Sequence, residues 1–382
     1  METPIEDAES TSSDSQGAPQ SFIAILLVVL VSVAVSVFAL FIPTDDATSP
    51  GQTLVCAAPE GWNSNIFDPA EGAADVAGVD FMSPAEHIQD IAFLVIGIAI
   101  GIFLIVEGVL VFTIIRNRRR NDIEGEPVQL YGSAPIELAW TVVPFLIVGV
   151  LCLVTIRTIN TVQLTEPPEG ALRVQVIAHQ WWWEFRYPEE NVVTANELIV
   201  PVGKPIWLEM SSADVVHSFW VPRLCGKTDL IPNRVNYLWF QTSEPGWYYG
   251  QCAEYCGNQH ANMLLGVEVR SEESFESWVI EQTSPLVDPT DELAISGHAM
   301  FLELSCQNCH PLGDEAVGTF APDLTHLMSR ERFASGLVPN TEENLRAWLV
   351  DPQNVKPGCN MPSLKLSDTQ LDAVVAYLVT LK

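Results

Sequence analysis

Long apolar stretches constrain this chain of 382 residues more than any other feature. Three of them are long enough to cross a bilayer as helices: Phe22 to Ile42, Ile91 to Ile115 and Leu138 to Ile156. The loop between the second and third carries four arginines within 116–120, and no Lys or Arg precedes them. Because basic loops stay in the cytoplasm, the sequence predicts a transmembrane hairpin at 90–160, with everything that follows on the outer side.

The first apolar stretch, within 21–43, has two interpretations. Its length suits a secretory signal, but the preceding residues 1–20 are acidic where a signal is basic, which favours a retained helix. We expect residues 1–20 to be a disordered acidic segment and residues 44–89 to be an extracytoplasmic linker.

The chain is strongly acidic, with 18 basic against 48 acidic residues and a formal charge of −30. This balance argues against nucleic acid as a partner and permits attraction of a basic protein. Solubility alone would also explain it.

Residues 161–282 contain short β-rich runs separated by turn residues, several of which alternate apolar with polar side chains. The runs are Leu172–Ile177, Lys204–Met210, Val235–Phe240, Trp247–Gln251 and Leu264–Val269. Many short strands with Gly and Pro turns predict a Greek-key sandwich or barrel.

The loop between the last two of these runs holds Cys252, Cys256, His260 and Met263, and we expect His217 on a separate loop. Thiolate, thioether and imidazole ligands together select copper. Two thiolates four residues apart can bridge two copper ions, which leaves one histidine for each and the methionine as a weak ligand. A zinc site or a disulfide is the alternative, but structural zinc sites do not use methionine.

A second cofactor motif, Cys306-Gln-Asn-Cys309-His310, predicts covalent haem c attachment, with two thioether bonds and a histidine on the iron. A redox Cys pair is the alternative. A helical run from about Asp291 and a methionine at Met361 favour haem, since His/Met ligation is typical of cytochromes c. His326 and Met328 compete as sixth ligands but lie close in sequence to the motif. We expect a capped C-terminal helix from Ser367.

Three further cysteines, Cys56, Cys225 and Cys359, lie on the predicted outer side, where disulfides persist. Spacing alone gives no pairing.

The copper motif and the stretch from about Pro135 to Val269 resemble subunit II of cytochrome c oxidase, and residues 288–382 resemble a small class I cytochrome c. Together they resemble a caa3-type fusion. The resemblance implies a cupredoxin-like fold for 161–282, an all-α fold for 288–382, and the dinuclear copper centre called CuA. It also implies that the Glu254 carbonyl binds copper and that its carboxylate reaches a magnesium ion shared with subunit I.

The resemblance implies two more roles. Trp181, in the aromatic run 179–187, would be the electron entry point, and Glu137 would stand at a proton-uptake path into subunit I. The plainer interpretations are a core strand for the aromatic run, a helix-start acid for Glu137 and a solvated loop acid for Glu254. Cys225 and Asn233 depart from the family pattern without touching a ligand.

By the same resemblance, electrons would pass from haem c to CuA and on to a haem in subunit I, where oxygen is reduced and protons are pumped. Partners would be subunits I and III, and a donor such as a soluble cytochrome c or complex III. The chain would be a multi-pass protein of the bacterial inner membrane with both cofactor domains on the periplasmic side. A CuA-type nitric oxide reductase subunit and a membrane-anchored carrier without a catalytic partner remain alternatives.

Overall fold

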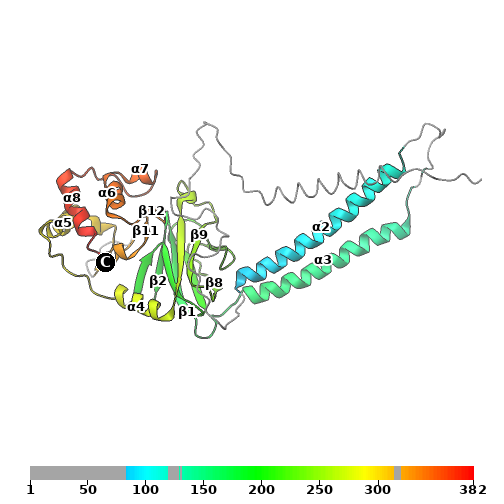
Figure 1. The fold of residues 1–382 in the computed structure, drawn as a ribbon, viewed down its shortest axis with the longest axis horizontal. Coiled ribbons are helices and arrows are strands. Elements are labelled where there is room, and N and C mark those ends of the chain that lie inside the picture. The colour runs from blue at the N-terminus through cyan, green and yellow to red at the C-terminus, as the bar shows by residue number, and fades with distance from the viewer. Residues whose placement is uncertain (1–82, 119–128, 130, 314–319) are drawn as a thin grey trace, which may run out of the picture. The chain divides into compact units, whose positions relative to one another are not determined.

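The computed structural model describes residues 83–118, 129, 131–313 and 320–382 (Figure 1). The predictions for residues 1–20, for 21–43 and for Cys56 lie outside this range, as do most of those for 44–89.

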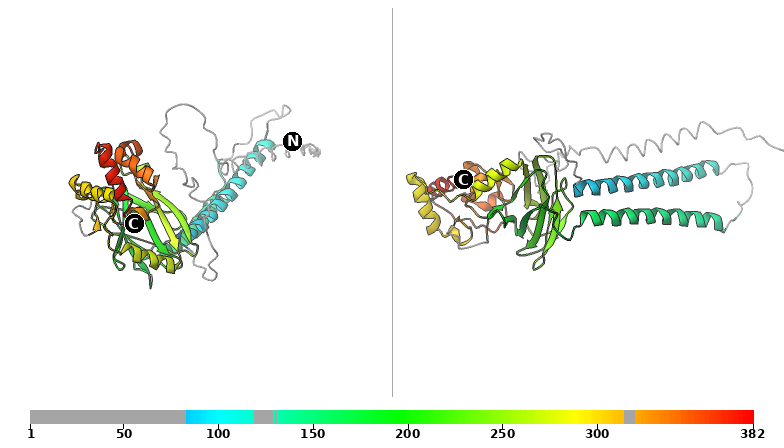
Figure 2. Two further views of the ribbon diagram at one scale, coloured as in Figure 1. Left: turned by 60° about the vertical axis from the view of Figure 1, so that its left-hand side comes forward. Right: turned by 90° about the horizontal axis from the view of Figure 1, so that it is seen from below.

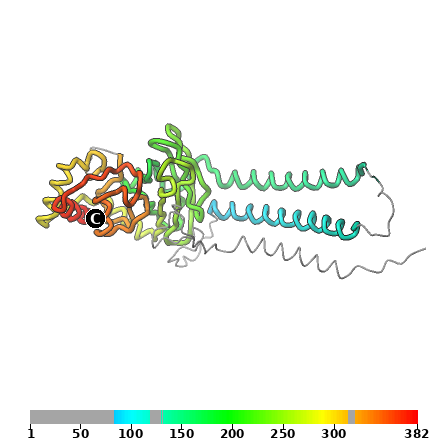
Figure 3. The backbone as a smooth tube through the Cα atoms, turned by 90° about the horizontal axis from the view of Figure 1, so that it is seen from above, coloured from blue at the N-terminus to red at the C-terminus, as the bar shows by residue number. Residues whose placement is uncertain are grey.

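Two long apolar helices, α2 (Pro84–Arg116) and α3 (Ala134–Val162), contain the second and third predicted spans. Each runs without a break, α3 despite Pro144 in its interior (Figure 3). The most apolar windows of α2 and α3 have mean hydropathies of 2.8 and 2.5, and none of either window is buried. Both helices therefore present apolar side chains along their length, as a membrane or a partner subunit requires.

A sandwich of two five-stranded sheets follows (Figure 2). The first sheet has the order β3-β2-β1-β5-β8 and the second the order β4-β10-β9-β6-β7. The strands are β1 (Leu172–His179), β2 (Trp182–Tyr187), β3 (Val192–Ala195), β4 (Glu197–Pro201), β5 (Ile206–Ser212), β6 (His217–Trp220), β7 (Thr228–Leu230), β8 (Asn236–Phe240), β9 (Gly246–Cys252) and β10 (Leu264–Arg270). All five predicted runs are strands, within a few residues at each end.

Alternation along the strands builds the core between the two sheets. On β1, Val174, Val176 and Ala178 are fully buried while the residues between them are half-buried. From β2, Trp183 meets Phe219 of β6 edge to face, with ring centroids 5.7 Å apart. Side chains of the two sheets thus interdigitate directly, which holds the strand ends in place.

Helix α4 (Glu272–Gln282) follows β10, and sequence reasoning missed it. Ser271 caps it, and Trp278 packs against the Tyr187 ring at 5.3 Å. The missed signal is a serine followed by two acids, with Phe275 and Trp278 three residues apart on one face.

The C-terminal part is helical apart from the short strands β11 (Arg332–Phe333) and β12 (Val338–Pro339). Its helices are α5 (Glu292–Glu303), α6 (Glu342–Val350), α7 (Pro352–Val355) and α8 (Asp368–Leu378). Helix α8 begins with the predicted cap at Ser367, which forms a capping box with Gln370, and it buries Leu371, Val374 and Leu378.

Helices α5 and α8 lie side by side at very close range (Figure 1). A Cβ at Gly297 of α5 would collide with the backbone carbonyl of Ala373 in α8, so only glycine allows this contact. This helix pair forms one wall of the C-terminal core.

Candidate functional site

A cluster of sulfur and imidazole groups lies inside the sandwich, where β6 and β9 meet the loop before β10. Cys252 ends β9, and its Sγ lies 3.8 Å from that of Cys256 in the loop. His217 Nδ1 is 3.9 Å from the first sulfur, and His260 Nδ1 is 3.6 Å from the second. Each thiol therefore has its own histidine, which is the arrangement that two bridged metal ions need.

Two further donors complete the cluster. Met263 Sδ lies 3.8 Å from Cys256 Sγ, and the backbone carbonyl of Glu254 lies 3.2 Å from Cys252 Sγ. Met263 is fully buried, whereas the Glu254 side chain is exposed. The six predicted copper residues are thus brought together, and their soft donor set fits copper better than zinc or a hard cation.

The thiols of Cys252 and Cys256 are hydrogen-bonded to each other. The hydrogen bond between the two sulfurs lowers the pKa of Cys252 to about 3 and raises the pKa of Cys256. A metal bound by both sulfurs has to displace the proton of this hydrogen bond, as thiolate ligation always does.

The prediction that His217 lies on a loop is wrong, because it is the first residue of β6 and pairs with Leu230. Its ring is held by a residue that sequence reasoning missed: Asp214 Oδ1 lies 2.8 Å from His217 Nε2. Burial opposes ionisation of Asp214, but this hydrogen bond and two from backbone amides outweigh it and lower its pKa. A carboxylate on the outer nitrogen fixes the ring so that Nδ1 faces the sulfurs. The sequence signal that could have identified Asp214 is an acidic residue three positions before the histidine.

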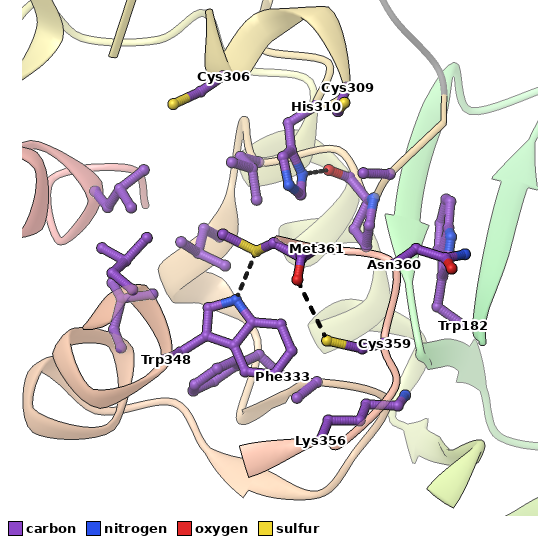
Figure 4. Close-up of a pocket in the computed structure, with 18 of the residues that line it drawn as sticks. Trp182, Cys306, Cys309, His310, Phe333, Trp348, Lys356, Cys359, Asn360 and Met361 are labelled. Atoms are coloured by element: carbon purple, nitrogen blue, oxygen red, sulfur yellow. Dashed lines mark hydrogen bonds between the residues drawn. The ribbon is translucent and has the colours of Figure 1, made fainter. Parts of the chain in front are cut away.

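The haem motif lines a cavity together with Met361, and the His310 ring points toward the Met361 sulfur (Figure 4). His310 Nδ1 donates to the carbonyl of Pro322 at 2.8 Å, which leaves Nε2 for a ligand. Burial lowers the pKa of His310, which favours the neutral ring that a metal binds.

On the other side of the cavity, the indole nitrogen of Trp348 donates to Met361 Sδ at 3.0 Å (Figure 4). The rival ligands do not line the cavity: His326 is turned toward the Lys382 carbonyl at 2.8 Å, and Met328 packs against the apolar core. Geometry therefore favours Met361 over both.

A buried arginine indicates which kind of cofactor suits this cavity. Arg330 lines it and donates from Nη2 to the Asp323 carbonyl at 2.6 Å, while its Nε has no hydrogen-bond partner in the described part of the chain. A buried cation with an unused donor fits a cofactor that carries carboxylates. Haem has two, so the residues present fit the group.

The sandwich itself supplies part of the cavity wall, through residues 180–182 and Asn196. Trp181 is half-buried there, and its indole nitrogen donates to the backbone carbonyl of Cys256 at 3.0 Å. This ring therefore touches both candidate centres.

Three further residues singled out in the sequence are Glu137, Cys225 and Cys359. Glu137 is exposed near the start of α3, and its carboxylate accepts from the Ser133 amide at 3.1 Å, a helix-capping contact. Cys225 is buried in the sandwich core and Cys359 lines the haem cavity, and both are free thiols.

Comparison with known proteins gives three family matches along this chain. Residues 77–158 match the transmembrane domain of cytochrome c oxidase subunit II, residues 190–270 its periplasmic domain, and residues 294–382 the cytochrome c family. Cytochrome c oxidase subunit 2 of Alkalihalophilus pseudofirmus is 34% identical over 318 residues, covering 81% of this chain and 92% of the relative. This chain belongs to the cytochrome c oxidase subunit II family.

A second relative agrees with this assignment. Subunit 2 from Bacillus subtilis is 35% identical over 292 residues, covering 71% of this chain and 82% of that protein. The crystal structure of the periplasmic domain of oxidase subunit II from Bradyrhizobium japonicum is 33% identical, with 31% of this chain and 96% of that chain covered and a TM-score of 0.30.

The family match and the architecture together identify a caa3-type subunit II, with two apolar helices, a cupredoxin-like sandwich and a fused cytochrome c domain. It is a membrane protein with a periplasmic domain, it works in a haem–copper oxidase beside subunit I, and its two domains imply copper and haem.

Proposed function

We propose that this subunit carries electrons from a haem c on its C-terminal domain to a dinuclear copper centre in its sandwich. From there the electrons continue to a haem in subunit I, where oxygen is reduced to water. The observation that carries this proposal is the pair of thiols 3.8 Å apart, each with its own histidine. When bound, haem and the copper pair each take up and release one electron.

The ligands we assign follow the geometry of the two centres. The haem would be held covalently by Cys306 and Cys309, with the iron between His310 and Met361. The copper pair would be held by His217, Cys252, the Glu254 carbonyl, Cys256, His260 and Met263. Strands β6, β9 and β10 anchor the copper ligands in a packed core, which limits their movement when the charge of the centre changes.

Trp181 would be the entry point for electrons to the copper centre. Its ring lies in the wall of the haem cavity and bonds the carbonyl of a copper ligand, Cys256. In this fused protein the entering electron would come from the chain's own haem, so an external donor would need to reach only the haem domain.

Three finer assignments concern the partners. Glu137 would collect protons at the cytoplasmic end of α3 for pumping through subunit I, its capping contact leaving the side chain exposed. The exposed Glu254 carboxylate would bind magnesium at the boundary with subunit I, since hard cations prefer carboxylate oxygen. The apolar faces of α2 and α3 would pack against subunit I, with subunit III nearby, in the bacterial inner membrane.

The donor would be a basic protein, a soluble cytochrome c or complex III, attracted by the net charge of −30. Attraction of this kind weakens as salt rises. A rate of haem reduction by a basic cytochrome c that is independent of ionic strength would speak against it.

Replacing one copper thiolate tests the electron route in the assembled oxidase. In Cys256→Ser, we expect continuous donor oxidation and oxygen consumption to be lost, while the donor still reduces the haem once and the haem then stays reduced. The matched control is Cys225→Ala, another buried thiol of the sandwich that lies outside the cluster; it should keep both activities. Full oxygen consumption in the Cys256 variant would contradict the proposal.

A further inference from the structure

One residue in the turn between β1 and β2 contacts the ligand loops of both centres. The side-chain amide of Gln180 donates to the Cys256 carbonyl at 2.7 Å. Its backbone carbonyl accepts from the side-chain amide of Asn360 at 2.8 Å. Asn360 is the residue directly before Met361, the proposed sixth ligand of the haem (Figure 4).

This turn is held firmly on both sides. The backbone nitrogen of Gln180 donates to Asp214 Oδ2 at 2.5 Å, and the same carboxylate holds His217. The carbonyl of Trp181 accepts from Lys356 Nζ at 2.8 Å and from the hydroxyl of Ser335. Lys356 is only 3% exposed, so its ammonium group sits in the protein interior with these two oxygens as partners.

These contacts join the two centres by covalent bonds and hydrogen bonds without a gap. The connection leads from Met361 to Asn360, across one hydrogen bond to Gln180, and across a second to Cys256. Electrons tunnel more readily along bonds and short hydrogen bonds than across space, so a continuous connection of this kind increases electronic coupling.

We propose that Gln180 is a positioning residue for electron transfer, coupling the haem ligand loop to the copper ligand loop in parallel with the Trp181 ring. The inference rests on the proposed function. One electron leaves the reduced haem iron and one reduces the oxidised copper pair, and no bond forms or breaks. Because Gln180 and Trp181 donate to the same carbonyl, each variant alone leaves the other connection in place.

The test measures electron transfer within the full chain carrying haem and copper. A light-activated ruthenium dye reduces the haem, and the loss of reduced-haem absorbance then gives the rate. We expect Gln180→Met and Asn360→Ala each to slow electron transfer several-fold. The double variant Gln180→Met with Trp181→Phe should be slower than Gln180→Met alone and slower than Trp181→Phe alone. Asn354→Ala, an exposed asparagine of α7, is the matched control and should leave the rate unchanged.

Two further readouts separate coupling from structure. In Asn360→Ala, both midpoint potentials and the copper resonance spectrum should match wild type. Hydrogen exchange of the Leu264 amide, which donates to the Ser335 carbonyl at 3.2 Å, should stay as slow as in wild type.

Unchanged rates in both single variants would overturn the inference. So would a slower rate that comes with shifted potentials or with faster Leu264 exchange. A wild-type chain that binds both cofactors but transfers no electron between them would instead contradict the proposed function.

Discussion

The copper cluster and the haem cavity are built in opposite ways. The proposed copper ligands sit on or between paired strands of a packed sandwich, with donor atoms already 3.2 to 3.9 Å apart. The proposed haem ligands sit on irregular segments around a cavity, since His310 follows a short turn and Met361 lies in a loop between α7 and α8. The sandwich therefore brings its donor atoms together by its own packing, whereas the cytochrome domain leaves a cavity that we expect its cofactor to fill.

The largest expected difference between the two regions appears when the haem attachment is removed. In Cys306→Ala with Cys309→Ala, we expect α5 and α8 to lose most of their protection against hydrogen exchange, because an unfilled apolar cavity is costly. The strands of the sandwich should keep theirs. Mass-spectrometric exchange on the full chain measures both.

The reverse variant completes this test. Cys252→Ser with Cys256→Ser should lose copper yet keep the sandwich and the haem domain folded. Slow hydrogen exchange in α5 and α8 without haem would contradict the claim that the two regions differ in this way. A sandwich that unfolds without copper would contradict it as well.

A buried carboxylate between the two regions should make stability depend on pH. Glu197 of β4 is 6% exposed and accepts from the amides of Glu331 and Arg332 at 3.1 and 2.8 Å. Burial raises its pKa from 4.5 to about 7, with Arg330 nearby opposing the rise. Between these values the folded chain keeps a proton that the unfolded chain releases, so the free energy of unfolding falls as pH rises from 4.5 to 7.

The size of this effect is up to about 3 kcal/mol, after which stability levels off above pH 7. Denaturant unfolding of the full chain across this window measures it. Glu197→Gln should remove the extra slope, while Glu189→Gln, an exposed glutamate on the same domain, should retain it. If the free energy of unfolding changed equally with pH in wild type and in Glu197→Gln, the Glu197 carboxylate would not be the source of the pH dependence.

A smaller effect is expected where α5 meets α8. Gly297→Ala places a methyl group against the Ala373 carbonyl and Tyr377, so we expect a loss of roughly 2 kcal/mol in the stability of the haem domain alone. Thermal unfolding followed by haem absorbance measures it. Ser296→Ala, exposed on the same helix, is the control. An unchanged haem-domain midpoint, or an equal shift in the sandwich, would contradict the packing account.

The sequence pattern predicted those features of the fold that depend on residues close together in the chain. Alternation located five of the ten strands described in the sandwich, and the Cys and His spacings named donors that the fold brings together. Ser367 predicted the capped start of α8. These features need only neighbours in sequence.

Contacts between distant segments could not be predicted. The hydrogen bond from Trp348 to Met361 and the contacts of Gln180 depend on how separate loops meet. His217 was assigned to a loop because a four-residue strand shows too little alternation to recognise. Asp214 was missed because an acid before a histidine is common without a contact.

Metal analysis of the full chain, purified with haem attached and supplied with copper, tests the central claim most directly. Optical and electron paramagnetic resonance spectra should show two copper ions sharing one unpaired electron, beside one low-spin haem c. A folded chain that holds a single copper ion, zinc or no metal at all in the sandwich would contradict the account.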